Sequence, residues 1–339
     1  MRLEDTLPAD NTLGFGAAPL GNMFRDIPDD EAAATVEAAW ARGIRYFDTA
    51  PSYGAGLAEL RLGDVLAGHR RDDYVISTKV GRVVLDETED ATTRDYGDKT
   101  GIFAHGRANR LVSGYTADAT LRSIEGSLKR LRTDRLDIVW VHDIAQDIYG
   151  DEWLAQFEVA RKGAFRVLGK LREEGVIGAW GLGVNRVEPI ELVLDLAAPQ
   201  PDGMLLAGRY TLLDHERALQ RVMPAAIEKN VGIVVGGPYS SGVLVGGAHF
   251  EYRKAPPAIV AKVERITAIA ARYDVPVKAA ALQFVLAHPA VASVIPGASR
   301  PVRIAEDVDA LNATIPADFW REMCEQGLVA ANAPLPIDR

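Results

Sequence analysis

Cysteine is almost absent from this 339-residue chain, and its one instance, Cys324, has no partner for an internal disulfide. A single cysteine also excludes the CxxC spacing of zinc ribbons and of disulfide oxidoreductases. We therefore predict a protein of a reducing compartment, the cytoplasm, that carries no metal site.

Long apolar runs and an excess of positive charge are also missing. No run approaches the ~20 apolar residues of a membrane-spanning helix, and residues 1–10 lack the apolar core of a signal peptide. The 38 Lys and Arg residues are outnumbered by 47 Asp and Glu, for a net charge of −9. Such a chain has no electrostatic reason to approach nucleic acid or anionic lipid, and we expect neither as a partner. The sequence does not indicate an oligomeric state.

The chain also lacks the glycine fingerprint of doubly wound dinucleotide-binding folds. Gly14 and Gly16 come closest to GxGxxG, but Pro19 stands at the position of the third glycine. The run from Gly163 to Lys170 misses the spacing of a phosphate-binding loop by one residue. A nucleotide, if bound, is therefore expected on another architecture.

Short runs rich in β-branched and aromatic residues alternate with longer helical patterns from end to end. This alternation predicts parallel βα units, and eight of them indicate one (β/α)8 TIM barrel over residues 1–339, with its active site at the carboxyl ends of the strands. The predicted strands are residues 12–16, 45–48, 74–79, 136–142, 178–184, 204–206, 232–235 and 292–296.

Three segments depart from the regular pattern. Residues 84–115 are polar and too long for an ordinary βα connection, so they either shape the substrate pocket or form a disordered insertion. Residues 240–257 follow the seventh predicted strand and are placed to cover a cofactor. Pro224 interrupts the helical region 215–229, which is expected to kink or restart there.

Polar side chains stand at the carboxyl ends of three successive predicted strands. Asp48 ends the second strand and Tyr53 follows it closely, Lys79 ends the third, and His142 ends the fourth. Each alone has an ordinary structural explanation, as a turn cap, a rim aromatic, a solvated strand end or an interior histidine. Their joint position predicts one catalytic site.

These four residue types can deliver a proton to a carbonyl oxygen. A tyrosine with a pKa near ~10 is a weak acid at neutral pH, and a neighbouring ammonium is expected to lower that pKa. A carboxylate can hold the ammonium in place, and a neutral imidazole can orient the carbonyl. The set therefore predicts carbonyl reduction or the reverse oxidation.

The chain resembles the aldo-keto reductase superfamily over nearly its whole length. The resemblance rests on four runs, which are residues 43–54 (GIRYFDTAPSYG), 76–79 (ISTK), 127–142 (SLKRLRTDRLDIVWVH) and 295–300 (IPGASR). It implies that Tyr53 is the general acid or base, that Asp48, Lys79 and His142 assist it, and that NAD(P)H lies extended on the barrel rim.

The resemblance also implies a set of cofactor contacts, with departures from the common family pattern. Gly236 stands where relatives often stack a tyrosine on the nicotinamide, with Tyr239 nearby, and Gly297 stands where NADPH-preferring relatives often carry lysine. Arg300 and Arg303 could still grip a 2′-phosphate, so we predict NADP(H) as the preferred cofactor, with NAD(H) possible. The predicted cofactor residues are Gly16, Asp48, Asn185, Gly236, Tyr239, Ser241, Gly242, Leu244, Gly297, Arg300, Arg303, Glu306 and Asp307.

The runs 206–214 and 237–244 are most similar to the branch of aldose and pyridoxal dehydrogenases. We therefore expect a small-molecule aldehyde, ketone or sugar alcohol as substrate, with Phe24, Tyr149 and Phe103 as candidate pocket walls. Two alternatives stay open. One is a non-catalytic NADPH-binding sensor or regulatory subunit, and the other is a lyase or isomerase that uses Lys79 as a Schiff base.

Overall fold

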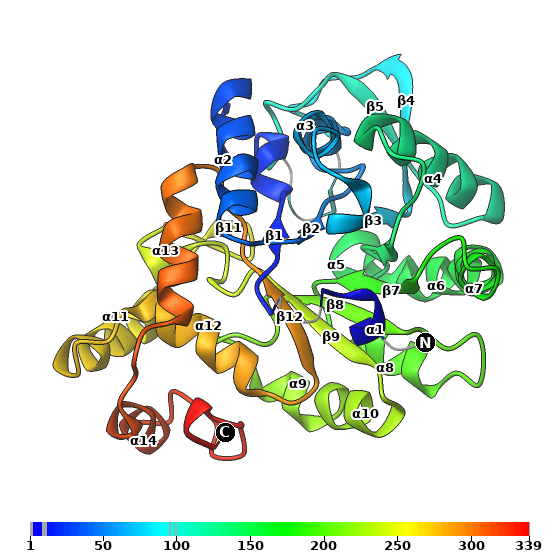
Figure 1. Cartoon of the computed structure of the whole chain (residues 1–339). Coiled ribbons are helices and arrows are strands. Elements are labelled where there is room, and N and C mark those ends of the chain that lie inside the picture. The colour runs from blue at the N-terminus through cyan, green and yellow to red at the C-terminus, as the bar shows by residue number, and fades with distance from the viewer. Residues whose placement is uncertain (1–2, 9–11, 95, 98, 100, 339) are drawn as a thin grey trace.

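The computed structural model describes residues 3–8, 12–94, 96–97, 99 and 101–338. Eight parallel strands stand side by side in chain order, and bridges from Leu13 to Val294 and from Gly16 to Gly297 join the first strand to the last. The predicted (β/α)8 barrel is therefore confirmed (Figure 1). Its strands are β1 (Phe15–Gly16), β2 (Tyr46–Asp48), β3 (Val75–Val80), β6 (Ile138–His142), β7 (Ala179–Val184), β8 (Gly203–Ala207), β9 (Gly232–Gly236) and β12 (Val291–Ile295).

Helices surround the barrel; α4, α7 and α12 pack directly on strands, whereas α14 packs on α11. In α4 the side chain of Thr116 caps the first turn by accepting a hydrogen bond from the amide of Ala119 (3.2 Å), and Arg132 ends the helix in a left-handed conformation. The helices of the outer layer are α2 (Asp29–Ala41), α3 (Leu57–Leu66), α4 (Ala117–Leu131), α6 (Trp153–Lys162), α7 (Ala164–Glu173), α8 (Glu188–Asp195), α9 (Glu216–Gln220), α10 (Val222–Lys229), α11 (Pro257–Arg272), α12 (Val277–Ala287), α13 (Pro301–Leu311) and α14 (Ala317–Glu325).

The expected interruption near Pro224 is present as the break between α9 and α10 at Arg221, since proline cannot accommodate the carbonyl four residues before it.

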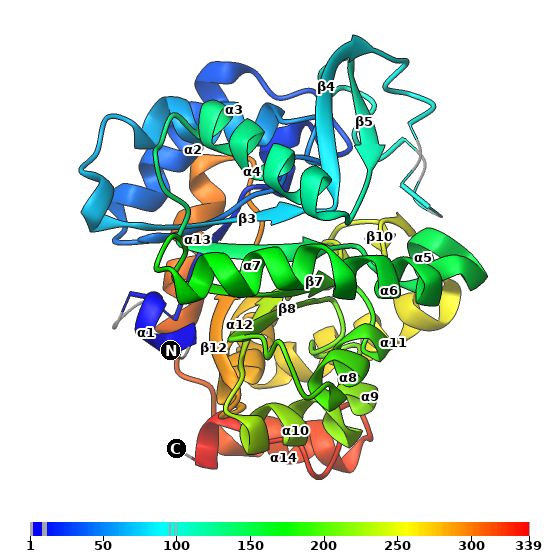
Figure 2. The same ribbon diagram turned by 90° about the vertical axis from the view of Figure 1, so that its right-hand side faces the viewer.

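A short helix that the sequence interpretation missed, α1 (Leu3–Thr6), closes the amino-terminal end of the barrel. Leu3 is fully buried, and a Cβ atom added to Gly203 would lie 2.6 Å from its Cδ2 atom. Thr6 approaches Gly178 equally closely. These glycines stand at the starts of β7 and β8, so α1 lies at the end opposite to His142 (Figure 2).

Alternation along the strands divides the barrel residues into two sets. One set points inward and fills the barrel, and the other packs under the helices in a larger core. Tyr46, Val75, Ile138 and Trp140 belong to the inner set. Because side chains repeat every two residues, Asp48, Lys79 and His142 share this inward orientation.

Residues 84–115 contain a β-hairpin, so they are neither a plain loop nor a disordered insertion over their described part. Strand β4 (Arg82–Thr88) pairs antiparallel with β5 (Asn109–Ser113), and the hairpin stands on the rim beside the end of β3 (Figure 2). Val83, Val84 and Leu111 provide the apolar and β-branched pairing that favours it. The second irregular segment carries another small hairpin, β10 (His249–Phe250) with β11 (Arg253–Lys254), preceded by a 3-10 turn at Val243–Val245.

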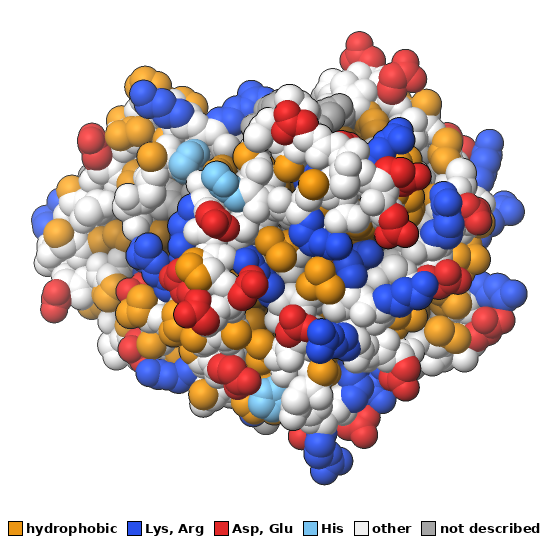
Figure 3. All heavy atoms as spheres, turned by 90° about the horizontal axis from the view of Figure 1, so that it is seen from above, with side chains coloured by type: hydrophobic (Ala, Val, Ile, Leu, Met, Phe, Trp, Pro, Cys, Tyr) orange, Lys and Arg blue, Asp and Glu red, His pale blue; other side chains and the backbone are white. Residues whose placement is uncertain are grey.

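The face of the molecule drawn in Figure 3 shows no extended basic patch. Acidic and basic side chains are interspersed over the face drawn in Figure 3. Within the described residues, no helix is long and apolar enough to span a membrane, and no group of His, Cys, Asp or Glu is arranged to hold a metal ion.

Candidate active site

A buried ion pair forms the centre of the site. The ammonium of Lys79 donates a hydrogen bond to Asp48 Oδ2 at 2.6 Å and another to the carbonyl of Thr49 at 2.8 Å. Ser77 donates to the other carboxylate oxygen of Asp48 at 2.6 Å. Lys79 and Asp48 are 1% and 2% exposed, so the pair is fixed and shielded from water. Burial raises the pKa of the Asp48 carboxyl, although Lys79 and Ser77 act in the opposite direction.

Tyr53 reaches this pair from the turn after β2. The turn runs through three consecutive positive φ angles, at Gly54, Ala55 and Gly56. Gly54 lies against the backbone of Gly21, where an added Cβ atom on Gly21 would lie 2.6 Å from the carbonyl carbon of Tyr53. This close backbone contact holds the tyrosine in place, and the Lys79 Nζ atom lies 4.7 Å from the centre of its ring.

The sequence interpretation expected Lys79 to lower the pKa of Tyr53, but the net shift is upward. The pKa of Tyr53 lies well above 10 because burial disfavours the phenolate and because the carboxylate of Asp48 disfavours a second negative charge. Lys79 does not reverse this rise, since its charge is already paired with Asp48 at 2.6 Å. Tyr53 therefore stays protonated at neutral pH.

His142 stands at the end of β6 with its ring edge-on to Tyr53, at a centroid distance of 5.9 Å. Its Nδ1 atom lies 3.4 Å from the hydroxyl of Ser52, and its backbone carbonyl accepts a hydrogen bond from Tyr115. Burial lowers the pKa of His142 well below 6.5, and the charges of Lys79, Arg82 and Lys99 lower it further. The imidazole is therefore neutral, as orientation of a carbonyl requires.

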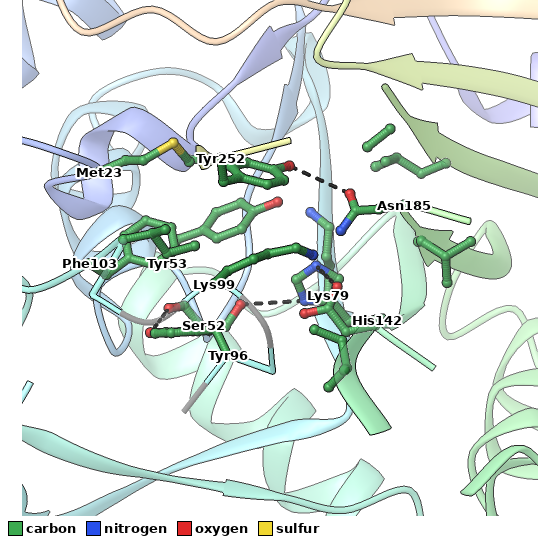
Figure 4. Close-up of a pocket in the computed structure, with 18 residues that line it drawn as sticks. Met23, Ser52, Tyr53, Lys79, Tyr96, Lys99, Phe103, His142, Asn185 and Tyr252 are labelled. Carbon is green, nitrogen blue, oxygen red and sulfur yellow. Dashed lines mark hydrogen bonds and ion pairs between the residues drawn. The ribbon is translucent and has the colours of Figure 1, made fainter. Parts of the chain in front are cut away.

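Tyr53, Lys79 and His142 line one small cavity of about 60 Å³ (Figure 4). The β4–β5 segment contributes part of its wall, so this segment shapes the pocket as the sequence interpretation expected. Tyr252, from the turn between β10 and β11, closes another side. Residues that the sequence analysis did not select as site residues also line the cavity, namely Met23, Ser52, Tyr96, Lys99, Ile102, Asp143, Ile148 and Tyr252.

The three candidate pocket walls are placed differently from one another. Phe103 lies in the small cavity, stacked on Tyr53 at 5.7 Å. Phe24 instead lines a second, larger cavity and stacks on His249 at 4.4 Å. Tyr149 packs against Tyr115 with its hydroxyl hydrogen bonded there, and it lines neither cavity.

The larger cavity, of about 620 Å³, begins at Asp48 and Tyr53 and extends along the rim to α13. Its shape and lining fit an extended dinucleotide, because backbone without side chains lines it at Gly16, Gly236 and Gly297 and cationic side chains line its far end. Of the predicted cofactor residues, those that line it are Gly16, Asp48, Gly236, Tyr239, Ser241, Gly242, Gly297, Arg303 and Asp307.

The turn after β9 lies beside the large cavity. Ser240, Ser241 and Gly242 all have positive φ angles, of 50°, 58° and 94°. The amides of Ser240 and Gly242 donate hydrogen bonds to the carbonyls of Gly237 (2.9 Å) and Tyr239 (3.0 Å), so these two amides are used within the turn. Ser241 and Gly242 line the large cavity.

Four predicted cofactor residues, Leu244, Arg300, Glu306 and Asn185, do not line the large cavity. Leu244 is buried in the main core, and Val245 lines the cavity in its place. Arg300 is exposed and paired with Glu31 (3.4 Å), and Glu306 is paired with Lys278 (2.9 Å). Asn185 lines the small cavity instead, where its side-chain oxygen lies 3.5 Å from the hydroxyl of Tyr252.

Tyr239 faces the adenosine end of the cavity and not the catalytic end. Its hydroxyl donates to Asp307 Oδ1 at 2.6 Å, and Lys278 binds the same carboxylate oxygen at 2.7 Å. Tyr252 is a second aromatic residue that, like Tyr53, lines both cavities. It lies in an irregular loop, where nothing in the sequence marks it as a site residue.

The comparisons with known proteins agree with this geometry. The model of the "Aldo/keto reductase family" matches residues 12–326. The chain is 37% identical over 329 residues to the pyridoxal 4-dehydrogenase of Microbacterium luteolum and 38% identical over 323 residues to the D-threo-aldose 1-dehydrogenase of a Pseudomonas species, with 94% of each chain covered in both cases. It also superposes on the holo form of an aldo-keto reductase from Bacillus halodurans with a TM-score of 0.68 and 26% identity, covering 95% of this chain and 93% of that one. The chain therefore belongs to the aldo/keto reductase family and is an NAD(P)-dependent oxidoreductase.

Proposed function

We propose that the protein transfers hydride between a nicotinamide cofactor and an aldehyde, ketone or sugar alcohol, with Tyr53 as the general acid or base. The observation that carries the proposal is the convergence of Tyr53, the Lys79–Asp48 pair and neutral His142 on one cavity that opens into the dinucleotide-sized one. The nicotinamide, when bound, supplies or accepts the hydride. The residues of the chain donate or accept the proton.

In the reduction direction the protonated hydroxyl of Tyr53 donates to the carbonyl oxygen. The imidazole of His142 orients the same oxygen by a hydrogen bond, because it is neutral and lies beside the tyrosine ring. Once the proton has left, the ammonium of Lys79 is the nearby positive charge that stabilises the phenolate. In the oxidation direction the phenolate removes the proton from the alcohol.

The substrate class and the cofactor preference belong to the same proposal. The names of the two relatives support a sugar or an aromatic alcohol and aldehyde as substrate. We propose NADP(H) as the preferred cofactor, on the basis of Arg303 at the adenosine end and Arg300 nearby. Both arginines are paired with carboxylates, so a 2′-phosphate would have to displace Glu306 from Arg303 and Glu31 from Arg300.

Purified protein tests this proposal directly. With NADPH or NADH and a panel of small aldehydes, we expect cofactor consumption at 340 nm, with tighter binding of NADPH in a fluorescence-quenching titration. The Arg303→Ala variant should weaken NADPH binding more than NADH binding. Cofactor binding without turnover of any carbonyl would favour the non-catalytic sensor, and equal affinity for both cofactors would contradict the NADP(H) preference.

A further inference from the structure

Lys99, which lines the cavity beside Tyr53, belongs to a second buried ion pair that the proton transfer does not use. Lys99 donates to Asp147 Oδ2 at 2.7 Å, with the two side chains 7% and 1% exposed. Lys99 comes from the β4–β5 segment and Asp147 from the short helix α5 (Gln146–Tyr149). Figure 4 shows Lys99 extending across the cavity toward Lys79 and His142. An ion pair at this position is costly to bury unless it has a further partner.

The pair has unused hydrogen-bonding capacity. Asp147 Oδ1 is buried and accepts no hydrogen bond within the described part of the chain, and Arg186 Nε lies 3.9 Å from it. A buried carboxylate oxygen without a donor costs free energy that a ligand hydroxyl can recover. Lys99 has three N–H donors, and Asp147 accepts from one of them.

Lys99 keeps its charge in this position. Burial alone would lower its pKa, but the carboxylates of Asp143 and Asp147 outweigh burial and raise the pKa above its usual value. The ammonium therefore remains a strong donor over the whole physiological range. A donor and an acceptor side by side can bind an alcohol group, because a hydroxyl donates one hydrogen bond and accepts others.

The Lys99–Asp147 pair lies next to the place where the reacting carbonyl would bind. Lys99 lines the small cavity together with Tyr53 and His142, and it also lines an adjoining cavity of about 40 Å³ together with Asp147. A substrate whose carbonyl lies between Tyr53 and His142 would therefore place its next carbons toward Lys99. Asn185 lines both cavities and adds an amide to the same wall.

We propose that Lys99 and Asp147 are specificity-determining residues that bind hydroxyl groups on the carbons next to the reacting one. The substrate is accordingly a polyhydroxylated aldehyde or its alcohol, and not a plain alkyl or aryl aldehyde. This inference rests on the proposed oxidoreductase function. An alkyl chain in the same place would leave Lys99 and Asp147 unsatisfied, and sites built to bind a hydroxyl reject analogues without it by large factors.

Glyceraldehyde and propanal provide the test, because both have three carbons and only the first carries hydroxyl groups. With saturating NADPH, and with both concentrations expressed as unhydrated carbonyl, the unmodified protein should show a kcat/KM for glyceraldehyde at least about 100-fold above that for propanal. Lys99→Met and Asp147→Asn should each lower the glyceraldehyde value by about 10–100-fold and the propanal value by less than about threefold.

Two readouts separate this inference from a general loss of function. NADPH binding, followed by fluorescence quenching, should be unchanged in both variants. The control is Lys170→Met, which removes the exposed lysine of the Lys170–Glu174 pair. It should change neither the ratio of the two kcat/KM values nor the affinity for NADPH. Equal kcat/KM for the two aldehydes in the unmodified protein, or parallel losses for both in the variants, would overturn the inference while the proposed function stands. Binding of NADPH without turnover of either aldehyde would contradict both.

Discussion

At the scale of single residues, the site depends on how charge is distributed among the buried Asp48, Lys79 and His142 and the partly buried Tyr53. Lys79 is held by Asp48, so its charge is present but already compensated. His142 is neutral, and Tyr53 is protonated because its surroundings disfavour a phenolate. The protein is therefore in the protonation state that carbonyl reduction requires before any substrate arrives.

This charge distribution predicts opposite pH dependences for the two directions. Because burial and Asp48 hold the pKa of Tyr53 well above 10, the acid form dominates throughout pH 7–10 and the base form grows about tenfold per pH unit. We expect kcat/KM for reduction to stay level over this range and kcat/KM for oxidation to rise steadily without a plateau. Initial rates in both directions at saturating cofactor provide the measurement.

The Asp48→Asn variant is the matching test. Removal of the carboxylate removes one cause of the high tyrosine pKa, so the rise in the oxidation rate should level off at lower pH, although the rate itself falls because Lys79 has lost its partner. An oxidation profile that does not move in this variant would count against the electrostatic coupling.

At the scale of elements, the strands and helices of the barrel could be predicted from the sequence, whereas the structure of the rim segments could not. The eight strands and the proposed catalytic residues at or near their ends follow from apolar runs that finish in a polar residue, a local signal. The β4–β5 hairpin, Lys99 and Tyr252 depend on contacts between distant segments, which periodicity does not encode. The direction of the Tyr53 pKa shift was also beyond sequence, since it depends on burial and on the pairing of Lys79 with Asp48.

The turn that carries Tyr53 gives a prediction at this scale. A methyl group at Gly54 would overlap the backbone of Gly21, and the position also has a φ angle of +63°. We expect Gly54→Ala to displace Tyr53 and to lower kcat by about 10–100-fold, since a displacement of about 1 Å can cost that much. Steady-state kinetics, together with a thermal melt to confirm folding, checks it.

Gly175→Ala is the matched control. Gly175 has a similar φ angle, +72°, but nothing lies within 4 Å of an added Cβ atom. It should share the backbone penalty of about 1–2 kcal/mol and leave kcat unchanged. If both variants lose activity equally, the contact between Gly54 and Gly21 does not position the tyrosine.

At the scale of the whole molecule, the two ends of the barrel have separate tasks. The carboxyl ends of the strands carry the cavities, whereas α1 seals the opposite end with Leu3. We propose that the chain forms one domain over residues 1–339. In this proposal Leu3 stabilises the fold at the amino-terminal end of the barrel, and the reaction takes place at the carboxyl end. Residues of the long rim segments, among them Lys99, Phe103 and Tyr252, line the small cavity.

Leu3→Ala should therefore separate stability from activity. Leu3 is fully buried against the starts of β8 and β9, so the cavity left by its truncation should lower the free energy of unfolding by about 2–5 kcal/mol. Below the unfolding transition kcat/KM should be unchanged. Urea denaturation measures the free energy of unfolding, and an assay at 25 °C measures kcat/KM. A large loss of activity in folded protein would contradict the separation of stability from activity.

The most direct test of the central claim is the Tyr53→Phe variant, which removes one hydroxyl and keeps the ring that packs on Phe103. Tyr149→Phe, which removes a hydroxyl that faces neither cavity, is the control. If Tyr53 transfers the proton, its variant will bind NADPH as the unmodified protein does, while kcat/KM for aldehyde reduction falls by about 10²–10⁴-fold. Reduction at the unmodified rate by Tyr53→Phe would contradict the account.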